Sequence, residues 1–191
     1  MNFVLIFGSV RSERQGIRVV RYLERTLSAR GHRMTTIDPE VYQLPILDKM
    51  YKEYPKGTAP APLEELAALY RAADGFLIVT GEYNHSMPPA LTNLLDHFLE
   101  EYFWRPSAIA CYSGGQFGGV RAAVQLRATL CELGMPSIPS LFPVPKVSEA
   151  FGEDGTPSDK GGVERRFARF ASELEWYAEA MKARRERGTP Y

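Results

Sequence analysis

The sequence predicts an α/β protein with one open sheet of parallel strands, covered by helices on both faces. Short apolar runs alternate along the chain with longer segments in which apolar residues recur at steps of three and four. The apolar runs are continuous, which is typical of strands buried on both faces. With 191 residues, 45% of them hydrophobic, the chain can bury a core, and we expect a single domain over residues 1–191.

Five segments have the composition of strands. The first, from Asn2 to Phe7, is wholly apolar after its first residue and ends at Gly8-Ser9, so we expect it in the centre of the sheet. The last is interrupted by prolines, which remove ladder hydrogen bonds, and is therefore expected at a sheet edge. The predicted strands are 2–7, 33–38, 75–79, 107–112 and 135–144.

Five segments with helical periodicity alternate with these strands. In the last one, Val163, Phe167 and Phe170 begin an apolar stripe that should dock on the sheet. The predicted helices are 16–30, 63–70, 88–102, 119–133 and a final helix from about 160. Strict alternation with right-handed crossovers specifies a parallel sheet, and five strands fit the flavodoxin-like order 2-1-3-4-5.

The charge balance excludes some partners. Lys+Arg and Asp+Glu both number 23, so the net charge is zero and the chain has no global field to recruit nucleic acid or an anionic membrane. Any anion must therefore be held locally. No apolar run approaches the roughly 18–20 residues that cross a bilayer, and the start lacks the basic flank of a signal peptide. We therefore expect a cytoplasmic protein.

Neither the histidines nor the cysteines suggest a metal centre. His32, His85 and His97 offer no ligand spacing, so no metal site is expected. Cys111 and Cys131 lie too far apart for a CxxC pair, and we expect both to be reduced, structural thiols.

Ligands of doubly wound sheets bind beyond the carboxyl ends of the strands, where the strand order reverses. The loop after the first strand, residues 8–16, combines hydroxyls, two flanking arginines and the free NH groups of a helix N-terminus, which suits a phosphate. It is neither a GxGxxG nor a Walker loop, which argues against an ordinary dinucleotide fold and a nucleoside triphosphatase. The alternative is a serine-rich turn with solvated arginines.

The loop after the third strand, residues 80–89, combines an aromatic ring, an amide and an imidazole. Such a loop can line the edge of a flat heteroaromatic ring, with Tyr83 over one face. Alternatively, Asn84 and Ser86 only form turn and cap hydrogen bonds, and His85 is a surface histidine.

The loop after the fourth strand, residues 112–119, has four glycines in six positions. Glycine density of this kind lets a backbone approach a ligand closely, and Phe117 is placed to cover a ring edge. The alternative is a flexible loop without a ligand.

Three segments of the sequence together resemble the motifs of a known protein family. They are GSVR from Gly8, EYNHSMPPALTN from Glu82 and SGGQFGGVRAAVQLR from Ser113. In this order and spacing they resemble the NADPH-dependent FMN reductase family of flavodoxin-like flavoproteins, which also includes azo-dye, quinone and chromate reductases. The similarity runs over about residues 1–145.

The resemblance implies FMN as the cofactor. It implies that the first loop binds the FMN phosphate and that the EYN and SGG loops bind the isoalloxazine and ribityl groups. The residues implied at the phosphate are Ser9, Arg11, Arg14, Gln15 and Gly16. Those implied at the ring are Glu82, Tyr83, Asn84 and His85, and those implied on the other side are Ser113, Gly114, Gly115 and Gln116.

The chain departs from the family pattern at three places. Arg14-Gln15-Gly16 stands where many members carry GSF or GSFN, Gly81 replaces a usual proline, and Thr92 replaces a usual lysine. The first change would give the phosphate a charged contact from Arg14 in place of a serine hydroxyl and an asparagine amide. The last puts in doubt the contact that the lysine makes, one candidate being a contact between subunits.

The implied activity is NAD(P)H oxidation with reduction of a flavin, quinone, azo or metal-oxyanion acceptor, and either NADPH or NADH is the donor. FMN performs the hydride chemistry, so no catalytic acid or nucleophile is required. Tyr83 and His85 are candidates for contacting the acceptor.

Two alternatives stay open. A one-electron carrier of the flavodoxin type is disfavoured, because the chain is neutral and lacks a TxTGxT phosphate loop. A flavin-binding regulatory module could use the basic run from Lys182 to Arg187 for an anionic partner, but cations on a last helical turn also favour the helix dipole.

The aromatic cluster Phe98, Tyr102, Phe103 and Trp104 either extends the core or forms a subunit interface. We expect a homodimer or a homotetramer built as a dimer of dimers, since the family completes its flavin cleft across a dimer. The proline-rich loop 39–62 is a candidate for the border of the same cleft.

Overall fold

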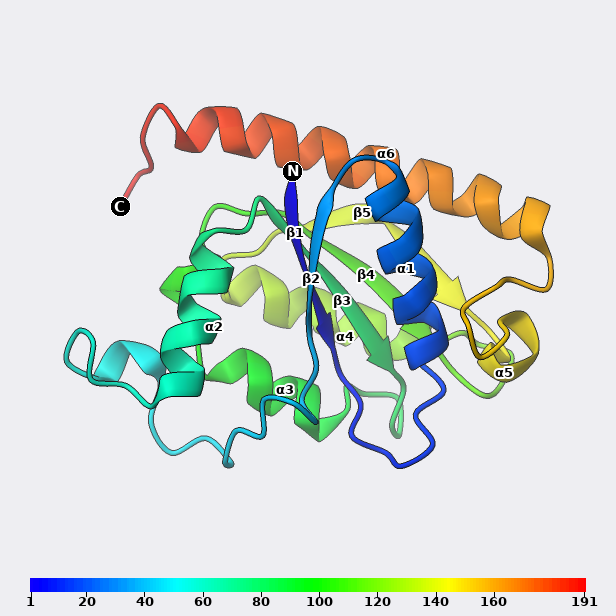
Figure 1. Ribbon diagram of the computed structural model, residues 1–191, viewed down its shortest axis with the longest axis horizontal. Helices are drawn as coiled ribbons and strands as arrows, with labels where there is room; N and C mark the ends of the chain where they lie inside the picture. The colour runs from blue at the N-terminus through cyan, green and yellow to red at the C-terminus, as the bar shows by residue number, and fades with distance from the viewer.

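The computed structural model describes residues 1–191 and contains one sheet of five parallel strands. Their order is β2-β1-β3-β4-β5, which confirms the predicted fold class and strand order (Figure 1). The strand bounds differ from the predicted ones by at most two residues at either end. The strands are β1 (Asn2–Phe7), β2 (Arg33–Ile37), β3 (Gly75–Gly81), β4 (Ser107–Tyr112) and β5 (Ser137–Val144).

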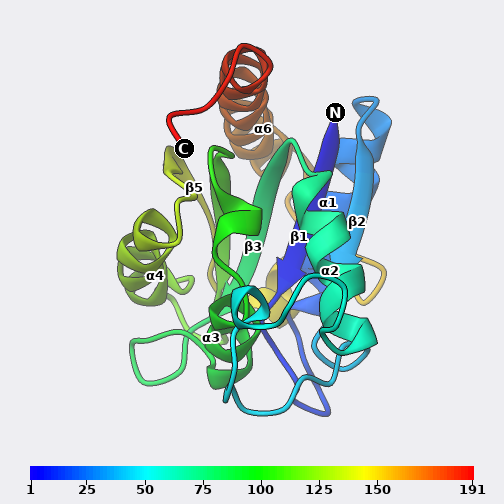
Figure 2. The same cartoon turned by 90° about the vertical axis from the view of Figure 1, so that its left-hand side faces the viewer.

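Helices connect the strands and cover both faces (Figure 2). The α-helices are α1 (Ile17–Ala29), α2 (Ala61–Arg71), α3 (Pro89–Asp96), α4 (Val120–Glu132), α5 (Val147–Ala150) and α6 (Lys160–Arg185). Two short 3₁₀ helices, η1 (Tyr51–Glu53) and η2 (Glu100–Tyr102), lie in the connections.

The predicted helix 88–102 is wrong beyond Asp96, where α3 ends. Its apolar spacing continues because Phe98 and Tyr102 are both fully buried, so the pattern gave no sign of a break. The buried Glu101 explains the change of geometry, since its carboxylate pairs with Arg71 at 2.7 Å and accepts the amide of Leu99 at 3.4 Å. The ion pair with Arg71, 30 positions earlier in the chain, holds η2 against α2 in place of a continued α-helix.

Each face of the sheet has its own core. In β1, Phe3, Leu5 and Phe7 face α1 and α6, whereas Val4 and Ile6 face α2, α3 and α4. This alternation follows from the two-residue period of a strand, and it explains why the run had to be apolar throughout. The predicted stripe of the last helix is confirmed, because Val163, Phe167, Phe170 and Leu174 are buried in the core of the α1 face.

The aromatic cluster divides between two surroundings. Phe98 and Tyr102 are core residues, which confirms one of the two alternatives for them. Phe103 and Trp104 instead pack against Tyr191 at the end of the chain, with ring centroids 5.8 and 5.0 Å apart. The chain's own terminus therefore contacts this part of the cluster.

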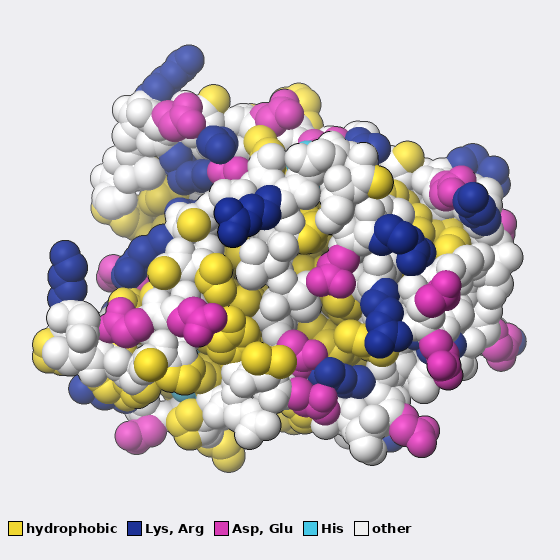
Figure 3. All heavy atoms as spheres, viewed as in Figure 1, with side chains coloured by type: hydrophobic (Ala, Val, Ile, Leu, Met, Phe, Trp, Pro, Cys, Tyr) yellow, Lys and Arg dark blue, Asp and Glu magenta, His cyan; other side chains and the backbone are white.

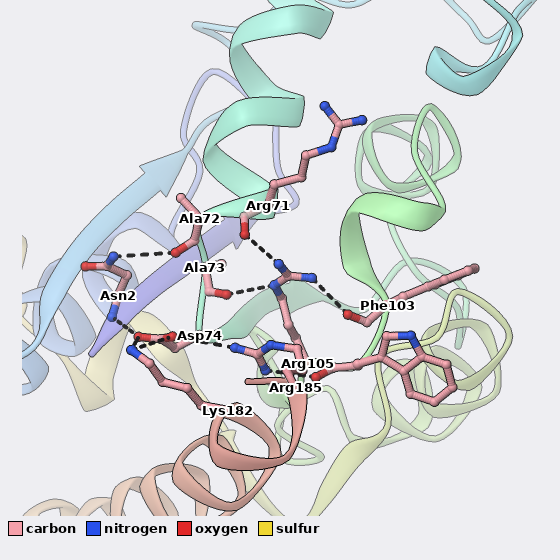
Figure 4. Close-up of polar contacts among 10 residues, drawn as sticks. Asn2, Arg71, Ala72, Ala73, Asp74, Phe103, Arg105, Lys182 and Arg185 are labelled. Atoms are coloured by element: carbon pink, nitrogen blue, oxygen red, sulfur yellow. Dashed lines mark hydrogen bonds and ion pairs between the residues drawn. The ribbon is translucent and has the colours of Figure 1, made fainter. Parts of the chain in front are cut away.

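A polar network fixes the C-terminal part of α6 to the amino edge of the sheet (Figure 4). Asp74 accepts the amide of Asn2 at 2.9 Å, and Lys182 Nζ and Arg185 Nη2 lie 3.1 and 3.6 Å from its carboxylate. Arg105 donates to the carbonyls of Arg71, Ala73 and Phe103. Burial, followed by the charge of Arg185, lowers the pKa of Arg105 to about 10, so it stays cationic at neutral pH.

The surface seen in Figure 3 mixes basic and acidic side chains, in keeping with the zero net charge. None of the helices has both the length and the apolar character needed to span a bilayer. Both cysteines are free. Cys111 is buried, which raises its pKa to about 12, but Cys131 lies on the exposed side of α4, so the expected structural role fits Cys111 alone.

Candidate functional site

A cavity of about 190 Å³ opens at the carboxyl edge of the sheet, where the loops after β1, β3 and β4 meet. Its lining comprises 13 residues from these loops, the adjoining strand ends and α5. Those that the sequence had indicated are Ser9, Arg11, Arg14, Gln15, Glu82, Tyr83, Ser113 and Gly114. The three candidate loops therefore form one site.

Five of the predicted residues lie outside this lining. Gly16 is buried beneath Tyr112, and a Cβ there would lie 2.3 Å from the ring. Asn84 and His85 form the exposed tip of a tight turn with φ of 49° and 65°, closed by backbone hydrogen bonds between Tyr83 and Ser86. Gly115 and Gln116 lie on the exposed part of the glycine-rich loop.

The sequence analysis missed the other five lining residues, which are Glu13, Gly81, Tyr112, Val147 and Ser148. Tyr112 ends a predicted strand and Gly81 lies in the loop predicted after another, so their position at the site could have been inferred from the fold alone. Val147 and Ser148 carried no such signal. They reach the cavity because the amide of Val147 donates to the Ser113 carbonyl at 3.0 Å and that of Lys146 to Gly115 at 2.9 Å.

The two predicted phosphate arginines have different surroundings. Arg14 forms ion pairs with Asp38 and Glu40 and donates to the Ser9 carbonyl at 3.3 Å, so it fixes the loop to the end of β2. The guanidinium of Arg11 is exposed and makes no hydrogen bond or ion pair. Arg11 is therefore the cation that remains available to an anionic ligand.

The backbone of the first loop offers further donors. The amides of Val10 and of residues 12–16 donate no hydrogen bond within the protein, whereas those of Ile17, Arg18 and Val19 donate to carbonyls of residues 14–16. The unpaired amides thus precede α1, while the first helical turn, which the sequence had indicated as the donor, is already bonded. Successive free amides beside a cation are a suitable site for an anion.

The loop after β3 is fastened to α4. The carboxylate of Glu82 is nearly buried and accepts Arg121 Nε at 2.8 Å, Nη2 at 2.7 Å and the Arg121 amide at 3.2 Å. One turn along α4, Gln125 accepts the hydroxyl of Ser86 at 2.7 Å. These contacts hold Tyr83, which lines the cavity, in a defined position.

The proline-rich loop is attached to α3 and contributes nothing to the lining of this cavity. Asn93 donates to the carbonyl of Pro45 at 2.8 Å and accepts the amide of Leu47 at 2.9 Å. The role of Asn93, which belongs to the EYN segment, is therefore to hold a neighbouring loop.

Comparisons with known proteins agree with this geometry. The sequence pattern of the family described as NADPH-dependent FMN reductase matches residues 1–149. A quinone reductase of Escherichia coli (strain K12) is 31% identical over 134 residues, which are 68% of this chain and 69% of that protein. An NADPH azoreductase of Bacillus sp. (strain OY1-2) is 35% identical over 78 residues, 40% of this chain but only 44% of that protein.

The fold has a counterpart among solved structures. FerB of Paracoccus denitrificans, a flavoenzyme NAD(P)H:(acceptor) oxidoreductase, superposes with a TM-score of 0.75 at 20% identity, covering 93% of this chain and 97% of that one. At this identity the likeness concerns the fold.

The family match spans the three loops that form the cavity, and it confirms the enzyme class, the FMN cofactor and the NAD(P)H dependence that the sequence predicted. The chain belongs to the NADPH-dependent FMN reductase family.

Proposed function

We propose that this protein uses NAD(P)H and FMN to reduce small acceptors such as quinones, azo compounds, free flavins or metal oxyanions. The observation that carries the assignment of the site is the donor set of the first loop. The guanidinium of Arg11 and the amides of Val10 and residues 12–16 have no partner within the protein, and Arg11 and residues 13–15 line the same cavity as Tyr83.

The residues present fit FMN. A dianionic phosphate matches the unpaired amides, Arg11 and the buried hydroxyl of Ser9. The cavity of about 190 Å³ is smaller than the roughly 300–1,000 Å³ that enclose a whole drug-sized ligand. It would therefore enclose the phosphate and only part of the rest of FMN, and the remainder would stay accessible to a donor and an acceptor.

When bound, FMN supplies the hydride chemistry, and the protein supplies binding and orientation. Tyr83, Ser113 and Gly114 line the cavity and would contact bound FMN, Tyr83 with an aromatic side chain. The amides of Glu82, Asn84 and His85 are free of internal hydrogen bonds, so they can donate to a ring that gains negative charge. His85 and Tyr83 are the side chains of this loop that we expect an acceptor to contact.

The test is an anaerobic titration of the FMN-reconstituted protein with NADPH and then with NADH, followed by the visible absorbance of the flavin. We expect bleaching by at least one nucleotide and recovery of the colour on addition of a quinone or an azo dye. Bound FMN that neither nucleotide bleaches would favour an electron carrier or a regulatory flavoprotein. Failure to bind FMN would overturn the proposal.

We also propose a homodimer or homotetramer in the cytoplasm. Two large apolar side chains, Phe117 of the glycine-rich loop and Val124 of α4, are 63% and 65% exposed, which supports burial against a second subunit. Phe117 follows the glycine pair of the site loop, so such an interface would border the cavity. A sedimentation experiment that finds a fully active monomer would contradict the dimer.

A further inference from the structure

The segment between β5 and α6, residues 145–159, supplies part of the wall of the cavity. Val147 and Ser148 belong to the lining, although this segment follows none of the three site loops. The family match ends at residue 149, so most of the segment lies beyond it. The family pattern therefore does not account for how the segment is held against the site.

Three arginines of α1 hold this segment by its backbone, and Figure 1 shows the segment beside that helix. Arg18, Arg21 and Arg25 follow one another at steps of three and four, which places them on one face of the helix. Arg18 Nη1 donates to the carbonyl of Phe151 at 2.8 Å. The other carbonyls that accept from these arginines are those of Glu153, Asp154 and Gly155. Because the acceptors are backbone atoms, these contacts fix the path of the chain.

Gly155 brings the segment into direct contact with the backbone of α1. Its φ is 79°, and a Cβ there would lie 2.8 Å from the carbonyl oxygen of Arg18 and from the amide nitrogen of Tyr22. A side chain at this position would push the segment away from the helix. Phe151 is 1% exposed, and its ring centroid lies 5.2 Å from that of Tyr22. The segment therefore has one defined position against α1.

Arg18 is the arginine most directly connected to the wall of the cavity. The amide of Phe151, whose carbonyl Arg18 binds, donates to the carbonyl of Val147 at 3.1 Å. The amide of Val147 in turn donates to the carbonyl of Ser113 at 3.0 Å. The side chain of Arg18 is 16% exposed and does not line the cavity. Arg18 therefore acts on the cavity through the position of α5.

We propose that Arg18 is a positioning residue for the flavin, which holds α5 so that Val147 and Ser148 close the cavity and slow the dissociation of FMN. This inference rests on the proposed function of the same cavity. Contacts made within a formed complex act mainly on the dissociation rate. The loss of Arg18 should therefore shorten the residence of FMN and leave its association rate nearly unchanged.

The test measures both rates for the full-length protein by stopped-flow, with flavin fluorescence as the signal. In Arg18→Ala, FMN should dissociate about three- to tenfold faster, up to the effect of one charge-assisted hydrogen bond. The association rate should stay within about twofold of that of the unaltered protein. An unchanged dissociation rate would overturn the proposal.

Salt separates this effect from a long-range attraction between the charge of Arg18 and the phosphate. At about 1 M salt the screening length is only about 3 Å, so such an attraction is lost in both proteins. We expect Arg18→Ala still to release FMN faster than the unaltered protein under these conditions. A difference that disappears in salt would assign the effect to charge and contradict the positioning role.

Hydrogen exchange gives a readout that needs no flavin. In the flavin-free protein, Arg18→Ala should speed the exchange of the amides of Val147 and Phe151 and leave those of β1 unchanged. An equal change in β1, or none at these two amides, would mean that Arg18 does not position α5. Arg169→Ala is the matched control, since Arg169 is exposed on α6 without a hydrogen bond or an ion pair, and it should change neither exchange nor FMN dissociation.

The failure of this inference is distinguishable from that of the proposed function. If the unaltered protein does not bind FMN, the site assignment fails and this inference fails with it. If the unaltered protein binds FMN and is reduced by NAD(P)H, but Arg18→Ala releases FMN at the unaltered rate, the inference on Arg18 alone is wrong.

Discussion

The two edges of the sheet differ in how completely their polar groups are paired within the protein. At the amino edge, Arg105 donates to three backbone carbonyls, and Lys182 and Arg185 converge on the buried Asp74. At the carboxyl edge, Arg11 has no partner and a run of loop amides is unpaired. The amino edge therefore uses these cations for cohesion, whereas the carboxyl edge pairs Arg14 and Arg121 within the protein but leaves Arg11 and the loop amides for a ligand. Substitutions should therefore separate folding stability from flavin binding.

The largest effect is expected where the carboxyl edge is also closely packed. Gly16→Ala would place a Cβ 2.3 Å from the Tyr112 ring, which Gly81 confines on its other side. Overpacking of this kind should lower the free energy of unfolding by about 3 kcal/mol and weaken FMN binding with it. Chemical denaturation and FMN titration measure both quantities.

Gly161→Ala is the control, because its Cβ would meet only Arg165 at 3.5 Å in the first turn of α6. We expect it to leave FMN binding unchanged and to raise the free energy of unfolding by at most about 1 kcal/mol, since alanine favours a helix over glycine. If Gly16→Ala also had little effect on stability and FMN binding, the packing of Tyr112 between Gly16 and Gly81 would not be rigid. The carboxyl edge would then be less constrained than these distances indicate.

Arg11→Ala tests whether the unpaired cation serves a ligand. It should weaken FMN binding more than tenfold, since a charge-assisted hydrogen bond contributes roughly 1.5–3 kcal/mol, and it should leave the unfolding free energy unchanged. Arg14→Ala is the comparison variant. It removes ion pairs to Asp38 and Glu40, so it should lower the free energy of unfolding. Unchanged FMN affinity in Arg11→Ala would move the phosphate to another place.

These two arginines also show how far a sequence alone can lead. Both flank the same loop, and their residue type predicts the same role. The partners of Arg14 follow a different strand, 24 and 26 positions along the chain, so only the packing of β2 beside β1 separates the two roles. Val147 and Ser148 were not predicted at the site for the same reason, because contacts with a loop distant in the sequence bring them there.

The fold was predictable because its signals are local. Each strand is a run of apolar residues, and each site loop stands out by its own glycine or polar content. The end of α3 was not predictable in this way. The buried Phe98 and Tyr102 continue the helical spacing beyond Asp96, into the segment where Glu101 pairs with Arg71. Contacts between distant residues decided the outcome there.

Asp74→Ala tests the amino edge. It removes an acceptor of the Asn2 amide and of two cations from a site where the carboxylate is only 8% exposed. The free energy of unfolding should fall by about 1.5 kcal/mol, with FMN affinity unchanged. Denaturation in urea and FMN titration of the same preparation test the two statements. A matching loss of FMN affinity would show that the edges are coupled.

The smallest effect is expected from Glu175, which links α6 to the same edge. Its carboxylate accepts Arg30 Nε and Nη2 at 2.6 Å and contacts His32 Nε2 at 2.7 Å. The hydrogen bonds from Arg30 are the main cause that lowers the pKa of Glu175 in the folded protein. A lowered folded pKa contributes stability that is present above the unfolded pKa of about 4.3 and is lost as the pH falls through the folded pKa.

Glu175→Gln should therefore be less stable than the unaltered protein at pH 7. The loss should be only about 1 kcal/mol, because Arg30 is partly exposed and solvent weakens the ion pair. The difference should shrink as the pH falls below about 4.3, since the unaltered carboxylate then becomes protonated as well. Urea denaturation at a series of pH values measures it, with Glu179→Gln, an exposed glutamate on the same helix without an ion pair, as the control. A difference that stays constant from neutral to acid pH would mean that packing, rather than charge, holds this end of α6 to the sheet.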